Sequence, residues 1–185
     1  MSRFFIAITL PDEVKDRLAA IRLPSMPGVR RIGRPEMHLT LQFLGDVSRP
    51  EIEIACEALH CIHASAFTLA INGVGRFPPT GPATVLWAGV DCSPQLLELN
   101  QRIGTALMDA IAFRPEARPY SPHITTARLK TSVPRSVIES YLEENRSFQT
   151  PAFAVKEFSL YSSVRVAGLP QYSEEFVFQL FEASP

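Results

Sequence analysis

Cysteine is scarce in this 185-residue sequence, with three copies, and no stretch approaches the roughly 18–20 consecutive apolar residues of a membrane-spanning helix. An odd, sparse set of cysteines does not suit a disulfide scaffold, and a chain of this length buries a sizeable core without one. The apolar run at the N-terminus ends at Pro11, and Asp12 and Glu13 follow it, which is unlike a secretory signal. We therefore expect a cytoplasmic protein with no membrane partner.

Net charge is also small, because 18 lysines and arginines stand against 19 acidic residues, for a formal charge of −1. This balance argues against a protein that coats nucleic acid through bulk attraction. The positive charge is nevertheless concentrated, since residues 17–35 hold five arginines and no acid, and residues 114–135 hold five basic residues and one acid. Either segment alone is typical of a solvated loop, so the charges indicate a site only together with a motif.

Apolar periodicity and turn residues predict an alternation of strands and helices, and hence an α+β fold. The order of elements in residues 3–90 is partly repeated in the second half, which favours a duplicated unit. Strands are expected over residues 3–10, 37–47, 67–74, 84–90, 123–129, 153–162 and about 171–181, and helices from residue 11 and over residues 50–64, 94–111 and 134–144.

A His-x-Thr-x motif occurs twice, as HLTL from His38 and as HITT from His123, 85 residues later. Both copies lie in expected strands, where side chains two residues apart point to the same face. His38 and Thr40 therefore project together, as do His123 and Thr125, while the intervening apolar residues turn toward the core. An imidazole and a hydroxyl roughly 6.5–7 Å apart along a strand can hold a tetrahedral anion, with the hydroxyl donating to an oxygen and the imidazole handling a proton.

Two such pairs from facing lobes would bracket one phosphorus atom. Cleavage of a phosphoester by water needs a base for the water and an acid for the departing oxygen, and in-line displacement places these on opposite sides of phosphorus. Histidine performs both roles near neutral pH because its unperturbed pKa is about 6.5. One His-x-Thr-x strand is common, but two copies, each beside an arginine-rich segment, predict a catalytic site. Residue chemistry leaves open which histidine is the acid.

The sequence resembles the two-histidine phosphoesterase superfamily, and within it the bacterial and archaeal RNA 2′,3′-cyclic phosphodiesterases, also called 2′-5′ RNA ligases. The resemblance covers nearly the whole chain and rests on the segments RFFIAITLP, HLTLQFLGDV, GRFPPTGPATVLWAGV, SPHITTARLK and FSLYSS. It implies one domain over residues 1–185, made of two pseudo-symmetric lobes that each contribute one motif. Two mainly antiparallel sheets would line a central cleft, with helices packed on their outer faces.

The resemblance also implies an activity, namely metal-independent hydrolysis of a terminal 2′,3′-cyclic phosphate on RNA to a 2′-phosphate. Some members of the family also join RNA through a 2′-5′ bond. RNA ends or small nucleotides that carry a cyclic phosphate would be the partners, with no metal and no cofactor. Because no exposed apolar stripe stands out, we expect a monomer.

By similarity, His38 is expected to donate a proton to the leaving oxygen, and His123 to accept one from water. Thr40 and Thr125 would bind phosphate oxygens, and Arg128 would add positive charge. Arg128 lies five residues after His123, so strict alternation would turn it away from the phosphate. A β-bulge or the end of the strand must re-aim it, or its role is structural.

Several residues depart from the family pattern or lie near the motifs. Thr126 occupies a position that is usually apolar in the family, and Arg31 stands where relatives often carry an aromatic residue, which weakens a role in base stacking there. The single tryptophan, Trp87, is expected in the core. Phe77 is expected to pack between the lobes, with contact to a base as the alternative.

Two other interpretations remain at this point. The chain could be a nucleotide- or RNA-binding module without activity, although binding alone does not require two proton carriers. It could also be a phosphodiesterase acting on 2′-5′ oligonucleotides or cyclic ADP-ribose phosphates.

Cys56, His60 and His63 share one side of an expected helix and could suggest a zinc site. Because a fourth ligand is lacking, we interpret this segment as ordinary helix surface.

Overall fold

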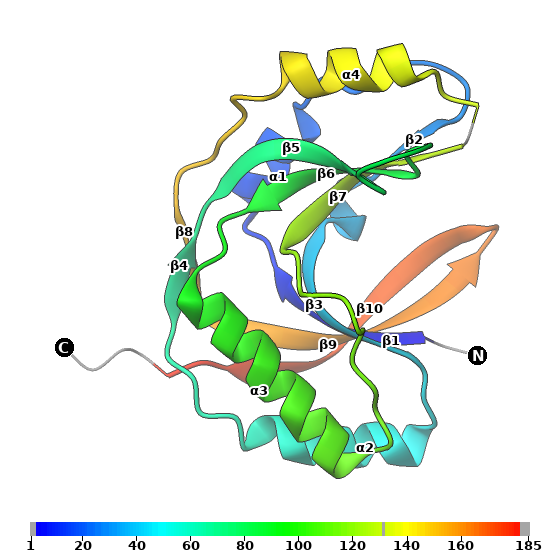
Figure 1. Cartoon of the computed structure of the whole chain (residues 1–185). Coiled ribbons are helices and arrows are strands. Elements are labelled where there is room, and N and C mark those ends of the chain that lie inside the picture. The colour runs from blue at the N-terminus through cyan, green and yellow to red at the C-terminus, as the bar shows by residue number, and fades with distance from the viewer. Residues whose placement is uncertain (1–2, 131, 182–185) are drawn as a thin grey trace.

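The computed structural model describes residues 3–130 and 132–181. In it, strands and helices alternate along the chain much as the sequence predicts (Figure 1). The predicted α+β class with mainly antiparallel sheets is confirmed. The elements are β1 (Arg3–Thr9), α1 (Asp12–Ala19), β2 (Val29–Arg31), the short 3₁₀-helix η1 (Arg34–Glu36), β3 (His38–Asp46), α2 (Arg49–His60), β4 (Phe67–Leu69), β5 (Ile71–Phe77), β6 (Val85–Val90), α3 (Pro94–Ala110), β7 (His123–Leu129), α4 (Arg135–Glu144), β8 (Phe153–Val155), β9 (Glu157–Val166) and β10 (Leu169–Gln179).

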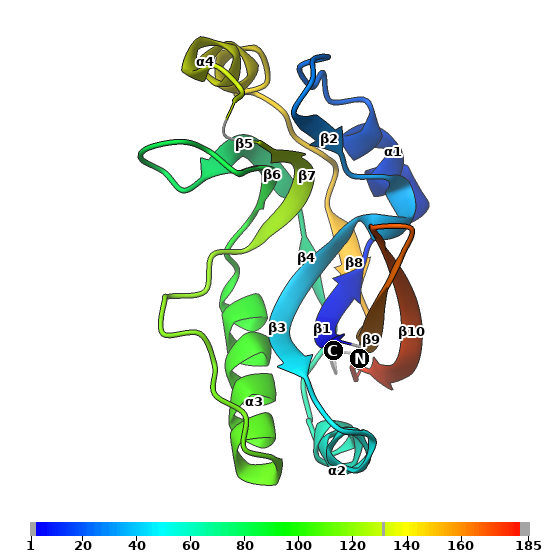
Figure 2. The same cartoon turned by 90° about the vertical axis from the view of Figure 1, so that its right-hand side faces the viewer.

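In the described residues, these strands form two four-stranded sheets and one two-stranded pair. The first sheet has the order β10-β9-β1-β3, the second has the order β2-β7-β6-β5, and β4 pairs with β8. Every named pair is antiparallel. The two His-x-Thr-x motifs therefore begin strands of different sheets, β3 at the edge of the first and β7 inside the second. β3 contacts β7 where the sheets meet (Figure 2).

The boundary between the sheets does not follow the two halves of the sequence. β1 and β3 come from the first half but share a sheet with β9 and β10, whereas β2, β5 and β6 join β7. The apolar run of β1 explains part of this exchange, because residues 4–8 are all buried and therefore need neighbours on both edges and both faces. The division into sheets therefore differs from the division of the sequence into two halves, on which the expectation of a duplicated unit is based.

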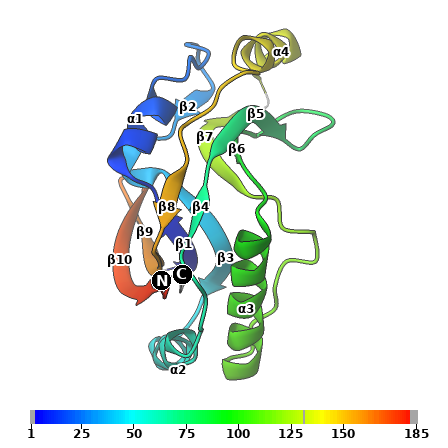
Figure 3. The same cartoon turned by 90° about the vertical axis from the view of Figure 1, so that its left-hand side faces the viewer.

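Three segments differ locally from the prediction. Residues 24–36, for which the sequence predicts neither a strand nor a helix, contain β2 and η1. The strands expected over residues 67–74 and 153–162 are each interrupted by one residue. The short strands β4 and β8, which precede these interruptions, pair with each other (Figure 3). In each case the strand is defined by a partner more than 80 residues away in the sequence, which local periodicity does not reveal.

The helices pack with one apolar stripe each toward a single buried cluster that includes residues of both sheets. In α3 the buried stripe also contains a polar and a small residue, Asn100 and Gly104, and this helix packs against α2 and β3. Leu39 of β3 and Ile124 of β7, which alternate with the motif residues, are completely buried. No helix in the described ranges has the length and apolar character needed to span a bilayer.

Trp87 lies outside this core, contrary to the prediction. Its side chain is half-buried on β6, and its ring covers Gly75, the residue opposite it in the register with β5. A methyl group at Gly75 would lie 2.1 and 2.2 Å from the ring carbons Cζ2 and Cη2. The glycine therefore allows the indole ring to lie directly against the backbone of β5.

Replacing Gly75 with alanine should lower the free energy of unfolding by about 1–3 kcal/mol, because the indole ring or β5 must move. Urea denaturation measures this change. Gly33→Ala is a matched control, since the nearest atoms would lie 3.7 Å from the new methyl group. That variant should stay within about 0.5 kcal/mol of the wild type. Equal losses in both variants would contradict the predicted clash.

Candidate active site

Both copies of the motif show the alternation of burial that their strand position predicts. In β3, His38 and Thr40 are half-buried, and the leucines that follow each of them are enclosed. In β7, His123 and Thr125 are half-buried on either side of a completely buried isoleucine. Each strand therefore presents one imidazole and one hydroxyl on the face away from the core.

A β-bulge in β7 changes the direction of Arg128. The register with β6 shifts across Thr126, which is an extra residue without a partner of its own. Thr126 and the next residue, Ala127, are both buried, whereas Arg128 is exposed. The alternation is thereby reset, so Arg128 lies on the same side of β7 as His123 and Thr125. Of the alternatives that the sequence left open for Arg128, the β-bulge is the one present.

His38 lies in an aromatic environment formed by the first sheet. The ring of Phe5 in β1 stacks on it with centroids 4.7 Å apart, and the ring of Tyr172 in β10 meets it edge-on at 5.2 Å. Tyr161 of β9 stacks on Phe5 at 5.3 Å, and its ring centroid lies 6.3 Å from that of His38. Burial lowers the pKa of His38 to about 4, although a hydrogen bond to the backbone of Glu36 and the charge of this residue oppose the shift. The imidazole is therefore neutral at neutral pH.

His123 has an equivalent position in the second sheet. Its Nδ1 lies 2.8 Å from the carbonyl oxygen of Ser121, two residues earlier. A carbonyl only accepts, so Nδ1 carries the proton and Nε2 is left with a free lone pair in the neutral ring. Phe77 contacts the ring edge-on at 4.8 Å. Burial lowers the pKa of His123 below its ordinary value, against the opposing effects of the Ser121 hydrogen bond and the charge of Glu116.

Electrostatic coupling connects the two sheets at this point. Positive charge at His123 and at Arg128 lowers the pKa of His38, in addition to the larger effect of burial. Such a shift requires short separations in a protein interior. Together with the contact between β3 and β7, this effect indicates that His123 and Arg128 lie near enough to His38 to influence its charge.

Three groups at this site are free to bind a ligand. In the part of the chain that the structure describes, the hydroxyls of Thr40 and Thr125 make no side-chain hydrogen bond, and Arg128 makes neither a hydrogen bond nor an ion pair. Arg30 lies opposite Arg128 in the register of β2 with β7. Its guanidinium donates to both carboxylate oxygens of Glu36, at 3.0 and 3.1 Å, so its charge is already compensated.

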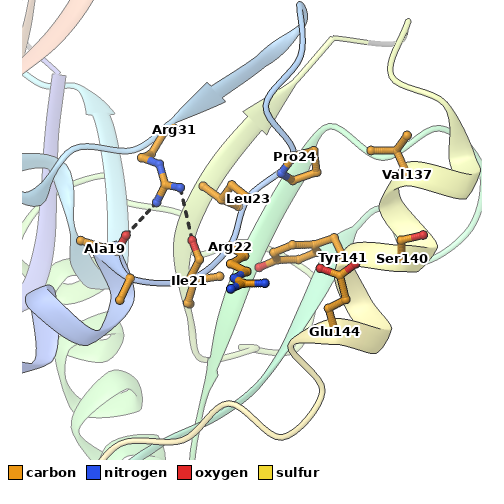
Figure 4. A pocket seen from close by; sticks show the side chains of 11 residues that line it. Ala19, Ile21, Arg22, Leu23, Pro24, Arg31, Val137, Ser140, Tyr141 and Glu144 are labelled. Carbon is orange, nitrogen blue, oxygen red and sulfur yellow. Dashed lines mark hydrogen bonds between the residues drawn. The ribbon is translucent and has the colours of Figure 1, made fainter.

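Other candidates from the sequence lie outside this arrangement. Arg31 donates to the carbonyl oxygens of Ala19 and Ile21, at 2.9 and 3.2 Å, and so binds the end of α1 (Figure 4). The ring Nδ1 atoms of His60 and His63 contact backbone carbonyls of their own segment. Within the described ranges, no three histidine, cysteine or acidic side chains are grouped to hold a metal ion.

A pocket of about 560 Å³ lies away from the histidines, between the end of α1, β2 and α4 (Figure 4). Arg22, Ser140, Tyr141 and Glu144 contribute to its lining, and none of the motif residues does. The hydroxyl of Tyr141 lies 3.5 Å from that of Thr126, which explains how a threonine is tolerated at this inward position.

The sequence did not reveal Phe5, Tyr161 and Tyr172 as neighbours of His38, because aromatic residues in strands are also typical of the core.

The lowered pKa of His38 should make stability depend on pH. An unfolded histidine titrates near 6.5, so between pH 6.5 and about 4 the unfolded chain binds a proton that the folded chain does not. The free energy of unfolding should therefore fall by up to about 3 kcal/mol as pH decreases through this range. His38→Gln should flatten the dependence in denaturation curves measured at several pH values. His63→Gln, at an exposed position, should leave it unchanged, and identical curves for both variants would contradict the assignment.

Known proteins match this chain along most of its length. The RNA 2′,3′-cyclic phosphodiesterase of Archaeoglobus fulgidus is 26% identical over 181 residues, which cover 96% of this chain and 99% of that protein. The protein of the same name from Geobacillus stearothermophilus is 33% identical over 132 residues, covering 69% of this chain and 42% of the relative. The crystal structure of Escherichia coli LigT complexed with 3′-AMP aligns with a TM-score of 0.79 at 28% identity, covering 97% and 98% of the two chains.

A family model described as the 2′-5′ RNA ligase superfamily matches residues 10–167, a range that contains both histidine strands, the bulge and Arg128. The resemblance on which the sequence analysis relied is thus confirmed. The chain belongs to the 2′-5′ RNA ligase superfamily.

Proposed function

We propose that this protein hydrolyses terminal 2′,3′-cyclic phosphates of RNA to 2′-phosphates, without a metal ion or cofactor. The observation that carries this proposal is the pairing of two imidazole–hydroxyl couples on contacting strands of different sheets. Membership of the superfamily and the activity for which the relatives are named support the same reaction. The proposal includes one domain over residues 1–185, in which each lobe supplies one couple.

His123 is the proton acceptor in this mechanism. Its Nδ1 is bound to the Ser121 carbonyl, and its Nε2 is unprotonated in the neutral ring. The lowered pKa keeps the ring in this form at neutral pH. Nε2 accepts a proton from water as the water oxygen attacks phosphorus.

His38 donates the proton to the departing oxygen. As the bond between phosphorus and the 3′ oxygen breaks, this oxygen receives the proton from the ring, and the phosphate remains on the 2′ oxygen. With a pKa of about 4 in the unliganded protein, His38 is seldom protonated at neutral pH. The phosphate anion supplies the missing counter-charge, because an opposite charge nearby favours the protonated ring.

Thr40, Thr125 and Arg128 bind the phosphate oxygens. The two hydroxyls lie on the same strand faces as the histidines, and hydroxyl donors stabilise the charge that develops on phosphorus-bound oxygens. Arg128 adds a charge-assisted hydrogen bond and compensates the anion from the β7 side. This set of donors does not require a metal ion to neutralise a monoanionic cyclic phosphate.

The substrates are RNA ends or small nucleotides that carry a cyclic phosphate. Escherichia coli LigT, whose fold this chain shares, has been crystallised with 3′-AMP, which supports binding of a nucleotide. The small net charge favours local binding of an RNA end over wrapping of a long strand. Joining of RNA through a 2′-5′ bond is a second reaction expected from the family. A cytoplasmic location and a monomeric state stay predictions from the sequence.

Replacing either His38 or His123 with alanine should lower kcat by at least about 10²-fold, because each removes one proton-transfer step. Hydrolysis of an adenosine dinucleotide ending in a 2′,3′-cyclic phosphate measures the rate, with chelator present throughout. His63→Ala is the control and should match the wild type.

Wild-type turnover in both histidine variants would refute the mechanism, and full inhibition by chelator would refute metal independence. A wild-type protein that binds the dinucleotide without converting it is instead the binding module considered above. Offering 2′-5′ oligonucleotides and cyclic ADP-ribose phosphates in the same assay ranks the alternative substrates by kcat/KM.

Replacing Arg128 with methionine should lower kcat/KM for the same dinucleotide by about 10–100-fold, the usual worth of a charged hydrogen bond. Lys130→Met, two residues further along and exposed beyond the end of β7, removes the same charge and should change kcat/KM by less than about threefold. Equal effects of the two substitutions would mean that only the overall positive charge matters, and that the bulge does not aim Arg128 at the phosphate.

A further inference from the structure

Three residues, 120–122, lead into the second motif, and each makes a hydrogen bond that fixes its place. The hydroxyl of Tyr120 donates to the carbonyl oxygen of Thr40, at 2.8 Å, although the two residues are 80 positions apart. The carbonyl of Ser121 accepts from His123, and the carbonyl of Pro122 accepts from the amide of Val90 in β6. The segment therefore connects the second sheet to the first motif through the Tyr120 side chain.

The strand that receives this bond, β3, is at the edge of its sheet and pairs with β1 on one side. Side chains from the second half of the sequence occupy its other side. Beside the bond from Tyr120 to Thr40, Asn100 of α3 donates to the carbonyl of Leu41 at 2.6 Å, and Gln42 donates back to the carbonyl of Asn100 at 3.1 Å. Three consecutive residues of β3 are thus hydrogen-bonded to Tyr120 or Asn100, which both come from the second half of the sequence.

A register shift in β3 lies within the same three residues. Thr40 is opposite Ala7 of β1 and Gln42 is opposite Ile6, so Leu41 is an extra residue. Close approach of α3 is possible because Gly104 faces Gln42, where a methyl group would lie 3.2 Å from the amide nitrogen. Asn100 therefore binds the carbonyl oxygen of the extra residue, Leu41. Tyr120 binds the carbonyl oxygen of Thr40, the motif residue immediately before Leu41.

We propose that Tyr120 is a positioning residue that sets the separation between the two imidazole–hydroxyl couples. This inference rests on the proposed function. Tyr120 lies three residues before His123, and its hydroxyl donates to the backbone carbonyl of Thr40, two residues after His38. The amide of Ile32, six residues before His38, also donates to the carbonyl oxygen of Thr126 in the second motif, at 2.9 Å, but that bond continues the pairing of β2 with β7 within the second sheet, whereas the Tyr120 bond crosses from one sheet to the other. The loop that carries Tyr120 runs back from α3 to β7, with α3 and β7 both in contact with β3 (Figure 2).

Tyrosine suits this role physically. The ring has two rotatable side-chain bonds, so a half-buried phenol holds its hydroxyl at a nearly fixed distance from its backbone. Burial raises the pKa of Tyr120, which keeps the hydroxyl protonated and able to donate over the working range of pH. In a reaction with an acid and a base on opposite sides of one phosphorus, a displacement of about 1 Å costs up to about 10²-fold in rate.

The substitution Tyr120→Phe removes the hydroxyl and retains the ring. For the adenosine dinucleotide with a 2′,3′-cyclic phosphate, we expect kcat to fall by about tenfold or more, while KM stays within about twofold. This split follows because the spacing of the couples matters most in the transition state. Tyr141→Phe is the matched control, since it removes the hydroxyl of another buried tyrosine, whose contact with Thr126 is long. Its kcat should equal that of the wild type.

Thermal unfolding of both variants separates positioning from general loosening, and the two melting temperatures should agree within about 5 °C. Undiminished kcat in Tyr120→Phe would overturn the inference, as would an equal loss of kcat in both variants. An increase in KM with unchanged kcat would assign Tyr120 to substrate binding and would also overturn it. The wild type is assayed alongside, and its failure to turn over the dinucleotide would refute the proposed function itself, whatever the variants do.

Discussion

The period of two along a β-strand is the constraint on which the site depends. In β3 and β7 the residues that alternate with the motif are completely buried, so burial of Leu39 and Ile124 fixes the direction in which the histidines point. A slip of one residue in either register would turn an imidazole into the core and an aliphatic side chain out of it. Packing of the hydrophobic core therefore sets the direction in which the site residues point, and the hydrophobic effect maintains it. What the core does not fix is the separation of the two strands, because they belong to different sheets.

Desolvation then determines the protonation state of the site. Aromatic rings of the first sheet surround His38, and burial lowers its pKa to about 4, while burial lowers the pKa of His123 as well. Both imidazoles are neutral in the unliganded protein at neutral pH, which suits a base and not an acid. Under the proposed mechanism, the anionic substrate itself charges one ring. Acid catalysis is thereby coupled to the presence of the phosphate, and Arg128, which opposes protonation of His38 when the site is free, becomes compensated in the same event.

The sequence predicts the local parts of this arrangement and misses the long-range ones. Strand parity, the two motifs and the need for an irregularity before Arg128 all follow from residue order, because they depend on neighbours within a few positions. The location of the bulge at Thr126 and the exchange of strands between sequence halves depend on partners more than 30 residues away. The same reason hides Tyr120, whose partner is 80 residues distant. Trp87 is misplaced although its partner Gly75 is close in sequence, because apolar alternation along β6 does not show that its ring covers a glycine on the neighbouring strand.

Arginine distribution illustrates how folding sorts residues that look alike in sequence. In the first arginine-rich segment, Arg34 pairs with carboxylates of α1, Arg30 pairs with Glu36, and Arg31 binds backbone carbonyls. These three hold η1, β2 and the end of α1 together, and carboxylates compensate the charges of Arg30 and Arg34. Arg128 differs because the bulge turns it to the motif face, where no described carboxylate meets it. A cation already paired releases few counterions on binding RNA, whereas an unpaired one does. Arg30 and Arg34 therefore add little to long-range attraction. Under the proposed mechanism, binding at this site depends on contacts of one arginine, two hydroxyls and two imidazoles with a single phosphate.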